Sequence, residues 1–297
     1  MEIRRLEVFC RVVELKSFTR AAEAVLLSQP TVSENIRLLE ETLGEKLFDR
    51  LGRQVLPTGA GKILYRHARR IIAQRDQALQ AIEQYRGQLV GDLNLGASTI
   101  PGAYILPERI VAFRVEHPTI QTRLRIAGTA RIAEALSEGT LELGVIGAKW
   151  KDQHLDCEEF YADELVLAVP SRHPWSKRVS VGVEELEAQP FILREEGSGT
   201  RMVMGRALKD YGFDPARLAV VAEMGSTEAV LQGIKAGLGL SILSSLAVAD
   251  DLRKGMLTSV PLKNLRIQRP FYLAQRKNRH LSPLALAFRR HLVGGNS

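Results

Sequence analysis

The chain has 297 residues, of which 45% are hydrophobic and 25% are charged. This balance is typical of a soluble globular protein and gives enough length for two or three domains. No apolar run approaches the roughly 18 residues needed for a membrane span, and the N-terminus lacks a signal-peptide pattern. The net charge of +7 is compatible with a polyanionic partner. We therefore expect a cytoplasmic, multi-domain protein without a membrane segment.

Cys10 and Cys157 are the only cysteines, and the six histidines are scattered. Two lone thiols without a CxxC motif indicate neither a zinc site nor a disulfide scaffold, although a redox switch is an alternative. Neither a phosphate-binding glycine loop, a dinucleotide-binding loop nor a nucleophile elbow is present. The sequence therefore predicts no metal, no cofactor and no catalytic residue.

Residues 17–44 predict two short amphipathic helices joined by a polar turn, preceded by a first helix over residues 2–15. Ser28 is placed to cap the second helix of the pair, and Pro30 falls in its first turn, where the missing N–H costs little. Its apolar stripe has helical spacing and consists of Val32, Ile36, Leu39 and Leu43. A helix-turn-helix whose second helix is polar on its outer face fits the major groove of DNA.

Residues 45–58 predict a wing, in which Leu47 and Phe48 dock on the helices and residues 54–56 form a return strand. Arg50 and Arg53 flank a turn glycine, which suits contact with backbone phosphates or a minor groove. For either arginine alone, a solvated turn charge is a serious alternative. Three helices followed by a cationic wing make a more specific pattern.

Residues 59–85 predict one long helix capped by Thr58, with a largely apolar seam. Because such a helix is not stable alone, we expect a partner helix from a second chain, with packing on its own domain as the alternative. Residues 1–58 contain nine basic and nine acidic side chains, whereas residues 59–90 contain six and two. The positive excess therefore lies largely in this helix. Residues 87–91 then read as a hinge.

From Asp92 onward, strands alternate with helices, which predicts α/β domains with mostly parallel sheets. The predicted strands are 92–97, 120–126, 141–146, 165–169, 191–193, 219–222, 240–243 and 266–274. The predicted helices are 104–116, 129–138, 201–211, 227–236 and 283–292. About 200 residues exceed one small domain, so we expect lobe I over 91–161 plus 266–297 and lobe II over 162–265.

Four turns between a strand and a helix share hydroxyls and free backbone N–H groups. They are Ser98-Thr99-Ile100-Pro101, Gly128-Thr129, Gly197-Ser198-Gly199-Thr200 and Gly225-Ser226-Thr227. Open α/β sheets bind ligands at the carboxyl ends of their strands, and helix N-termini favour anions. Any one turn alone is more simply a helix cap, but four together predict a cleft between two lobes. Arg194 and Arg201 flank the third turn as added charge or as surface residues.

The run from LEVFCRVVELKSFTRAAEAVLLSQPTVSENIRLLEETLG to EKLFDRLGRQVLPTGAG resembles the LysR-type transcriptional regulators. Farther along the chain, LGASTIPGAYILP, LELGVIG, GSGTR and KAGLGLSIL resemble the effector domain of that family. The resemblance implies an α+β multi-domain protein with a winged helix-turn-helix, a dimerising linker helix and a two-lobed effector domain like periplasmic binding proteins. It also implies homodimers or homotetramers that bind and bend double-stranded promoter DNA. A small metabolite would change the spacing between the DNA-binding domains of the oligomer.

By position, the resemblance implies that the bases or phosphates are contacted by Gln29, Pro30, Thr31 and Ser33. Arg37 would contact the backbone, and Arg53 would sit in the wing. Glu34 departs from the family, which often has a basic residue there; it either accepts from a cytosine or repels phosphate. The implied effector contacts are Ser98, Thr99, Thr129, Thr200 and Thr227. A small oxyanion is the favoured effector.

The sequence therefore predicts a DNA-binding regulator controlled by a small-molecule effector held between two α/β lobes. The alternative is an α/β ligand-binding or enzymatic protein that uses its N-terminal domain only for oligomerisation. The operator, the effector and the sign of regulation are not predicted.

Overall fold

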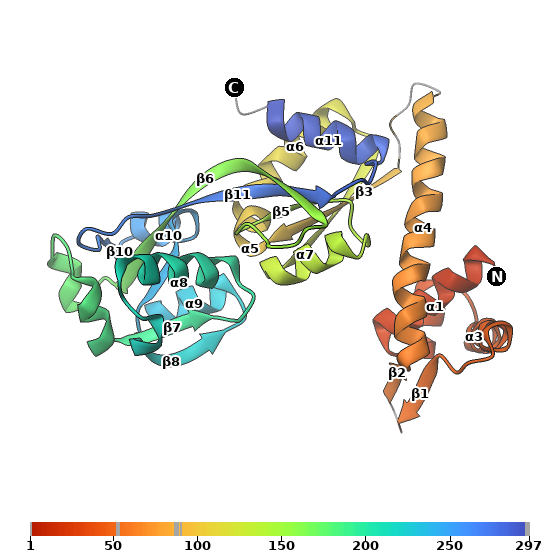
Figure 1. Ribbon diagram of the computed structural model, residues 1–297, viewed down its shortest axis with the longest axis horizontal. Helices are drawn as coiled ribbons and strands as arrows, with labels where there is room; N and C mark the ends of the chain where they lie inside the picture. Colours follow the sequence, from red (N-terminus) through yellow and green to blue (C-terminus); the bar gives the residue numbers. More distant parts are fainter. Residues whose placement is uncertain (1, 52–53, 86–88, 90, 295–297) are drawn as a thin grey trace. The chain divides into compact units, whose positions relative to one another are not determined.

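The computed structural model describes residues 2–51, 54–85, 89 and 91–294. The chain forms two compact units, Met1–Gln88 and Leu89–Ser297, and each is described by itself (Figure 1). The predicted hinge over residues 87–91 falls largely outside the described residues. In the described part, no helix is both long and apolar enough to cross a bilayer.

The first unit begins with the three predicted helices, α1 (Ile3–Leu15), α2 (Phe18–Ala24) and α3 (Gln29–Leu43). Ser17 Oγ accepts from the backbone N–H of Arg20 at 3.3 Å, which caps α2. Ser28 Oγ accepts from the N–H of Thr31 at 3.3 Å, so the predicted cap of α3 is confirmed. Both caps satisfy backbone donors that a helix start leaves unpaired.

The core of this unit contains the expected stripe of α3, because Val32, Ile36 and Leu39 are buried. The prediction that Leu43 continues this stripe is wrong, since Leu43 is 41% exposed. It is the last residue of α3, and Gly44 ends the helix with a φ of +71°, a left-handed conformation that suits glycine. The chain therefore turns away before Leu43 can reach the core.

A hairpin of β1 (Phe48–Leu51) and β2 (Gln54–Pro57) follows the helices, as the wing prediction requires. Leu47 is buried, and the ring of Phe48 lies 5.4 Å from that of Phe9 and 5.7 Å from that of Phe18. The wing is thus anchored on the helices as expected. The backbone of Arg50 pairs with Val55; the side chain of Arg50 and all of Arg53 lie outside the described part.

The long helix α4 (Gly59–Tyr85) has the predicted bounds, and Thr58 Oγ1 caps it by accepting from the N–H of Gly61 at 3.0 Å. Early in the helix, one face packs on α1. Ala68 is buried there, and Glu14 on α1 accepts from Arg69 at 2.7 Å and from the Tyr65 hydroxyl at 3.2 Å. Part of α4 is therefore covered by its own domain, as the alternative interpretation expected.

Another set of apolar side chains on α4 stays exposed within this unit: Ile63 (53%), Ile71 (39%), Leu79 (56%) and Ile82 (52%). A monomer would leave this apolar surface in water, which is unfavourable. The seam predicted from the sequence is thus divided between an intramolecular face and a face that is free to meet a second chain.

If these side chains meet a second copy, Leu79→Asp should weaken self-association. Losing a buried leucine costs about 2 kcal/mol, which raises the dissociation constant about thirtyfold. Analytical ultracentrifugation over a concentration series measures this. Gln77→Asp is the control, because it adds the same charge two residues away, on the side of α4 opposite Leu79. Equal association of Leu79→Asp and the unaltered protein would contradict an interface on this face.

The second unit alternates strands and helices in the predicted order. Its strands are β3 (Gly91–Ser98), β4 (Ile120–Ala127), β5 (Leu143–Ile146), β6 (Leu155–Pro170), β7 (Pro190–Arg194), β8 (Ala219–Met224), β9 (Ser241–Ser244), β10 (Leu257–Val260) and β11 (Ile267–Arg276). Its α-helices are α5 (Thr99–Tyr104), α6 (Leu106–Glu116), α7 (Thr129–Ser137), α8 (Gly199–Tyr211), α9 (Thr227–Lys235), α10 (Ser245–Arg253) and α11 (Pro283–Gly294). Short 3-10 helices cover Pro174–Lys177, Val183–Ala188 and Pro215–Arg217.

Four features differ from the prediction. The expected helix over residues 104–116 is two helices, α5 and α6, and Pro107 lies in the first turn of α6. Strand β6 is much longer than the expected 165–169. Its first half is polar and partly exposed, so that half lacks the apolar run from which the strand was predicted. Helix α10 and strand β10 were not predicted.

The expectation of mostly parallel sheets is wrong. A seven-stranded sheet has the order β10-β6-β11-β5-β3-β4, with β9 also pairing with β6, and within it only β3 pairs in parallel, with β4 and β5. Strands β7 and β8 form a separate parallel pair. The antiparallel character comes from β6 and β11, which run side by side from one group of helices to the other (Figure 1).

Hydrophobic cores lie on both faces of the strands near each end of β6 and β11. One pair of buried clusters involves α5, α6 and α11 on one face and α7 on the other. A second pair involves α8 on one face and α9 with α10 on the other. Along the β6–β11 ladder, the clusters change between Phe271 and Ile267, where Asp163 pairs with Arg269.

Candidate functional site

The outer surface of α3 carries all six of its predicted DNA-contacting residues. Gln29, Pro30, Thr31, Glu34 and Arg37 are exposed and Ser33 is half-buried. The helical period places most of them on the side away from the buried stripe. Gln29 Nε2 donates to Ser33 Oγ at 2.9 Å, and the hydroxyls of Ser28 and Thr31 lie 2.7 Å apart. The polar groups are thus ordered at the start of the helix.

Arg37 is held by two carboxylates of its own helix. Its Nε and Nη2 donate to Glu34 at 2.7 and 2.6 Å, and its Nη1 donates to Glu41. These contacts raise the pKa of Arg37, and the hydrogen bonds from Arg37 lower the pKa of Glu34. A DNA phosphate must therefore compete with Glu34 for this arginine.

A surface hollow of about 660 Å³ lies beside this part of α3. Its lining includes Pro30, Ser33, Glu34 and Arg37 from α3 and Lys46 before the wing. Lys46 Nζ itself pairs with Glu40 at 2.6 Å. Phe18, Ile36 and Phe48 also line the hollow, which therefore combines apolar surface with side chains of both charges.

Part of the positive excess of α4 is neutralised as well. Arg75 pairs with Glu7 at 2.6 Å, and Arg69 pairs with Glu14 at 2.7 Å. Lys62 and Arg66 are exposed. The charge count of the sequence therefore overstates the number of cations that are available to a polyanion.

The four predicted turns lie where the sequence placed them, each between the carboxyl end of a strand and the start of a helix. The turns join β3 to α5, β4 to α7, β7 to α8 and β8 to α9. The N–H of Ala130 donates to the carbonyl oxygen of Gly197 at 3.2 Å. This hydrogen bond brings the second and third turns into direct contact, although they come from different cores.

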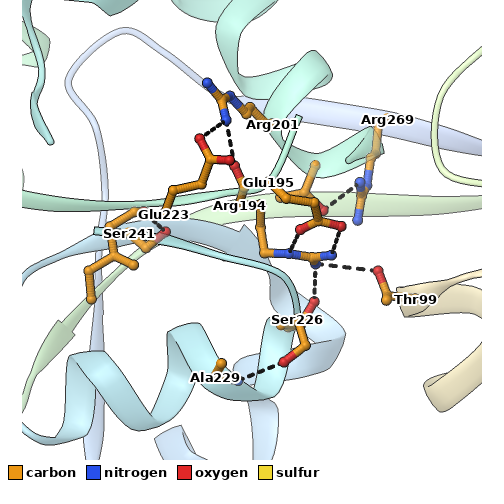
Figure 2. Close-up of polar contacts among 12 residues, drawn as sticks. Thr99, Arg194, Glu195, Arg201, Glu223, Ser226, Ala229, Ser241 and Arg269 are labelled. Atoms are coloured by element: carbon orange, nitrogen blue, oxygen red, sulfur yellow. Dashed lines mark hydrogen bonds and ion pairs between the residues drawn. The ribbon is translucent and has the colours of Figure 1, made fainter. Parts of the chain in front are cut away.

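Arg194 gathers two of the predicted threonines. Its side chain is 1% exposed at the end of β7. Nη1 donates to Thr227 Oγ1 at 2.5 Å and to Thr99 Oγ1 at 3.3 Å (Figure 2). Nε and Nη2 donate to the two oxygens of Glu195 at 2.7 and 2.8 Å. The first and fourth turns therefore meet at one buried guanidinium.

Arg269 binds one of the other three and lies near the remaining two. Its Nε donates to Asp163 at 2.8 Å and its Nη1 to Thr200 Oγ1 at 3.1 Å. Ser98 and Thr129 lie beside it around Gly147: a Cβ added to that glycine would be 3.2 Å from Ser98 Oγ, 3.5 Å from Thr129 Oγ1 and 3.6 Å from Arg269 Nη1. Thr129 Oγ1 accepts from the N–H of Gly147 at 3.3 Å.

Two polar atoms in this second group are buried without a hydrogen-bond partner among the described residues, Ser98 Oγ and Arg269 Nη2. Nη2 lies 2.8 Å from Asp163 Oδ2, so its contact is an ion pair without hydrogen-bond alignment. Burial lowers the pKa of Arg269, Asp163 opposes that shift, and the positive charge of Arg194 adds to it. This buried group thus brings together two neighbouring guanidiniums, each paired with a carboxylate, and two polar atoms that lack a hydrogen-bond partner among the described residues.

Sequence reasoning missed Arg269 and named Arg194 only as a flanking charge. The alternation of side chains along β11 could have indicated Arg269. Ile267, Phe271 and Leu273 are buried at every second position of β11, and Arg269 occupies the same face. A charged residue at an inward position of a strand is costly unless it is paired, so it marks a site. Arg201 has a different role: it donates to the carbonyl oxygen of Arg194 at 2.9 Å and to Glu223 at 2.6 Å (Figure 2).

Among the described residues, no group of three or more His, Cys, Asp and Glu side chains is arranged to hold a metal ion. Cys10 is buried, which raises the pKa of its thiol to about 12. Cys157 is half-buried in the other unit, and burial raises its pKa too.

One unit holds a helix-turn-helix with a wing, and the other holds four strand-to-helix turns beside two buried arginines, an arrangement that defines the class of a DNA-binding regulator with a ligand-binding domain. Two family models match this chain and describe the same class of protein. The model described as "Bacterial regulatory helix-turn-helix protein, lysR family" matches residues 3–62, and the "LysR substrate binding domain" matches residues 86–296. The chain belongs to the LysR family of bacterial transcriptional regulators.

Curated relatives cover nearly the whole chain. A RuBisCO operon transcriptional regulator of Allochromatium vinosum is 32% identical over 294 residues, 99% of this chain and 96% of the relative. A probable RuBisCO transcriptional regulator of Guillardia theta is 31% identical over 292 residues, 97% of this chain and 94% of the relative.

Solved structures show the same fold. The regulatory domain of Synechocystis PCC6803 CcmR, in complex with 2-PG, is 25% identical with a TM-score of 0.64, covering 70% of this chain and 98% of that one. CbnR, a LysR family regulator, is 23% identical with a TM-score of 0.73 over all of both chains.

The Glu34–Arg37 contact predicts that Glu34→Gln strengthens binding to non-specific duplex DNA. It removes a negative charge from the reading helix and releases Arg37 from one of its two carboxylates, so we expect about three- to tenfold tighter binding at low salt and a steeper salt dependence. Fluorescence anisotropy in a salt series measures both.

Glu45→Gln, the same change at an exposed position beyond the end of α3, is the matched control. Unchanged non-specific binding together with weaker operator binding would contradict this expectation and assign Glu34 to reading a base.

Proposed function

We propose that this protein controls transcription in response to a small anionic metabolite, which binds at the four turns gathered by Arg194 and Arg269. The observation that carries the proposal is this pair of buried arginines, surrounded by Ser98, Thr99, Thr129, Thr200 and Thr227. Guanidinium groups and hydroxyls suit a carboxylate or phosphate, and burial strengthens their electrostatic attraction. These five residues are thus proposed effector contacts.

The known relatives support a narrower class of effector. The CcmR regulatory domain binds 2-PG, 2-phosphoglycolate, which carries both a carboxylate and a phosphate. The curated relatives are regulators of RuBisCO genes. We therefore propose a small phosphorylated or carboxylated metabolite as the effector. Because the relatives are regulators and not enzymes, we propose that the cleft binds this molecule without transforming it.

The domain organisation we propose places the winged helix-turn-helix at 1–58, the dimerising linker helix at 59–87, lobe I at 91–161 plus 266–297, and lobe II at 162–265. The change of hydrophobic clusters at the Asp163–Arg269 position supports the lobe boundary. The exposed apolar side chains of α4 support a homodimer, or a tetramer of such dimers. We propose a cytoplasmic location, because the partner is DNA.

On DNA, we propose that Gln29, Pro30, Thr31 and Ser33 contact bases or phosphates, with Glu34 modulating Arg37 as described. Arg37, Arg50 and Arg53 would contact the phosphate backbone. The exposed polar start of α3 supports these roles, because the first turns of a recognition helix meet base edges.

Small oxyanions should raise the melting temperature of the protein, since a ligand that binds only the folded state stabilises it by about 2.7 kcal/mol at one hundred times its dissociation constant. Thr200→Val removes the hydroxyl beside Arg269 while keeping the shape of the side chain. We expect the stabilisation by 2-phosphoglycolate or inorganic phosphate to fall several-fold in a thermal-shift assay.

Thr122→Val, the same change on β4 outside the cleft, should leave the stabilisation intact. An oxyanion effect that persists in Thr200→Val, or no effect of any oxyanion on the unaltered protein, would refute the proposed contacts.

Gln29→Ala and Ser33→Ala should weaken binding to promoter DNA from the gene's own neighbourhood by about ten- to hundredfold each, the range of a bidentate base contact. Binding to unrelated duplex should change much less, because phosphate contacts remain. Anisotropy titrations with both duplexes at one salt concentration measure the ratio. Equal losses on the two duplexes would show that these side chains do not read sequence.

A further inference from the structure

The buried guanidinium of Arg194 already holds an anion, the carboxylate of its neighbour Glu195. The two oxygens of Glu195 accept from Nε and Nη2 at 2.7 and 2.8 Å (Figure 2). These two parallel N–H groups form the edge of an arginine that recognises carboxylates and phosphates bidentately. The remaining nitrogen, Nη1, is taken by Thr227 and Thr99. An incoming oxyanion that seeks bidentate contact must therefore use the edge that Glu195 occupies.

Glu195 and Arg194 differ in how firmly they are held. The side chain of Arg194 is 1% exposed, whereas that of Glu195 is 28% exposed. The backbone N–H of Glu195 donates to Met224 at 3.1 Å, which fixes the main chain beside β8. The guanidinium is thus a buried part of the site, whereas the carboxylate lies at its partly exposed margin, next to water that can solvate it.

The charges of the cleft balance as it stands. Arg194 and Arg269 are opposed by Glu195 and Asp163, two cations against two carboxylates. Asp163 is fixed, because its side chain is fully buried and is held by Arg269 at 2.8 Å and by Ser244 at 2.9 Å. Adding an anion without moving a carboxylate would leave a net negative charge in a buried site, which is strongly unfavourable. Exchange with Glu195 keeps the balance.

We propose that Glu195 is an internal stand-in for the effector, and that the carboxylate or phosphate of the effector replaces it on Arg194. This inference rests on the proposed function of the cleft. It selects for anions with two oxygens that can accept from the guanidinium edge, and it discriminates against neutral analogues. Glu195 thereby sets the affinity for the effector by competing with it, and acts as a specificity-determining residue that need not contact the ligand.

The exchange also reaches the facing core. A Cβ added to Gly128, at the start of α7, would lie 3.5 Å from Glu195 Oε1. Two residues farther on, Ala130 donates to Gly197, which belongs to the same turn as Glu195. Moving the carboxylate therefore changes the surroundings of the start of α7, which this turn contacts through the hydrogen bond from Ala130 to Gly197. Binding of an anion is in this way coupled to the seam between the two sets of cores.

The test compares Glu195→Gln with Glu196→Gln in the full-length protein. Glu196 is the adjacent carboxylate; its side chain is 89% exposed and its contact, with Arg201, is 4.0 Å long. Isothermal titration calorimetry with 2-phosphoglycolate, inorganic phosphate and the neutral glycolamide is the measurement. We expect Glu195→Gln to bind the two anions about tenfold more tightly than the unaltered protein, because the competing ion is gone. Glu196→Gln should bind the two anions with the affinity of the unaltered protein. The affinity for glycolamide should not rise in Glu195→Gln.

Glu195→Asp guards against a folding defect in the first variant. Its shorter side chain keeps the charge but cannot span both nitrogens in the same way, so anion binding should be tighter than in the unaltered protein and weaker than in Glu195→Gln. Circular dichroism and promoter binding report folding. If Glu195→Gln does not fold, Glu195→Asp alone decides: equal or weaker anion binding overturns the proposal.

The outcomes separate this inference from the function on which it rests. Anion binding by the unaltered protein that is equal or weaker in Glu195→Gln overturns the exchange and leaves the effector cleft standing. An equal rise in anion affinity in Glu196→Gln also overturns the exchange, because removal of any nearby negative charge would then explain the rise. Absence of anion binding in the unaltered protein and in all variants overturns the proposed function as well.

Discussion

The second unit depends on the buried ion pair between Asp163 and Arg269, whose side chains are 0% and 2% exposed. The two residues are ladder partners on β6 and β11, at the point where one set of hydrophobic clusters gives way to the other. Taking two ions out of water is costly, and removing one partner from such a pair destabilises a protein by about 3–5 kcal/mol. The guanidinium is further held by Thr200 and lies over the ring of Phe271 at 4.7 Å. The pair thus orients the start of α8 against the crossing strands, and the cleft is built around it.

The two units use the same chemistry in opposite environments. Arg37 on α3 is held by Glu34 and Glu41 in full contact with water, whereas Arg194 is held by Glu195 with its guanidinium buried. Salt and water screen the first set, so its attraction for phosphate is modest and varies with ionic strength. Burial strengthens the electrostatic interactions of Arg194. Replacing Glu195 by an external anion there therefore changes the binding free energy more and discriminates more strongly between anions. In each case an external anion meets a cation that already has an internal partner, which favours the anion that fits over anions in general.

Features set by neighbouring residues could be predicted from the sequence. Ser28 and Thr58 cap their helices, and α4 has the expected bounds, because caps and helical periods are local. The four hydroxyl-bearing turns follow from their position between a strand and a helix, whereas the five individual side chains were named from the family resemblance. The long-range contacts could not be predicted: Asp163 and Arg269 are 106 residues apart, and Arg194 and Thr99 are 95 apart. The same limit explains α4, whose apolar seam gave no sign that one part would pack on α1 while another stayed exposed.

A ligand can shift a protein between arrangements only by as much as its contacts differ between them. The turn from Glu195 to Thr200 is suited to make such a difference, because it contacts three separate structures. Glu195 holds Arg194, Gly197 accepts from Ala130 on α7, and Thr200 accepts from Arg269 on the crossing strand. An anion on Arg194 that displaces Glu195 changes the first contact and leaves the third. The Glu195 end of the turn is then released while its Thr200 end stays held, and the hydrogen bond with α7 lies between these two ends. A small ligand could in this way bias the seam between the two cores without reaching both of them itself.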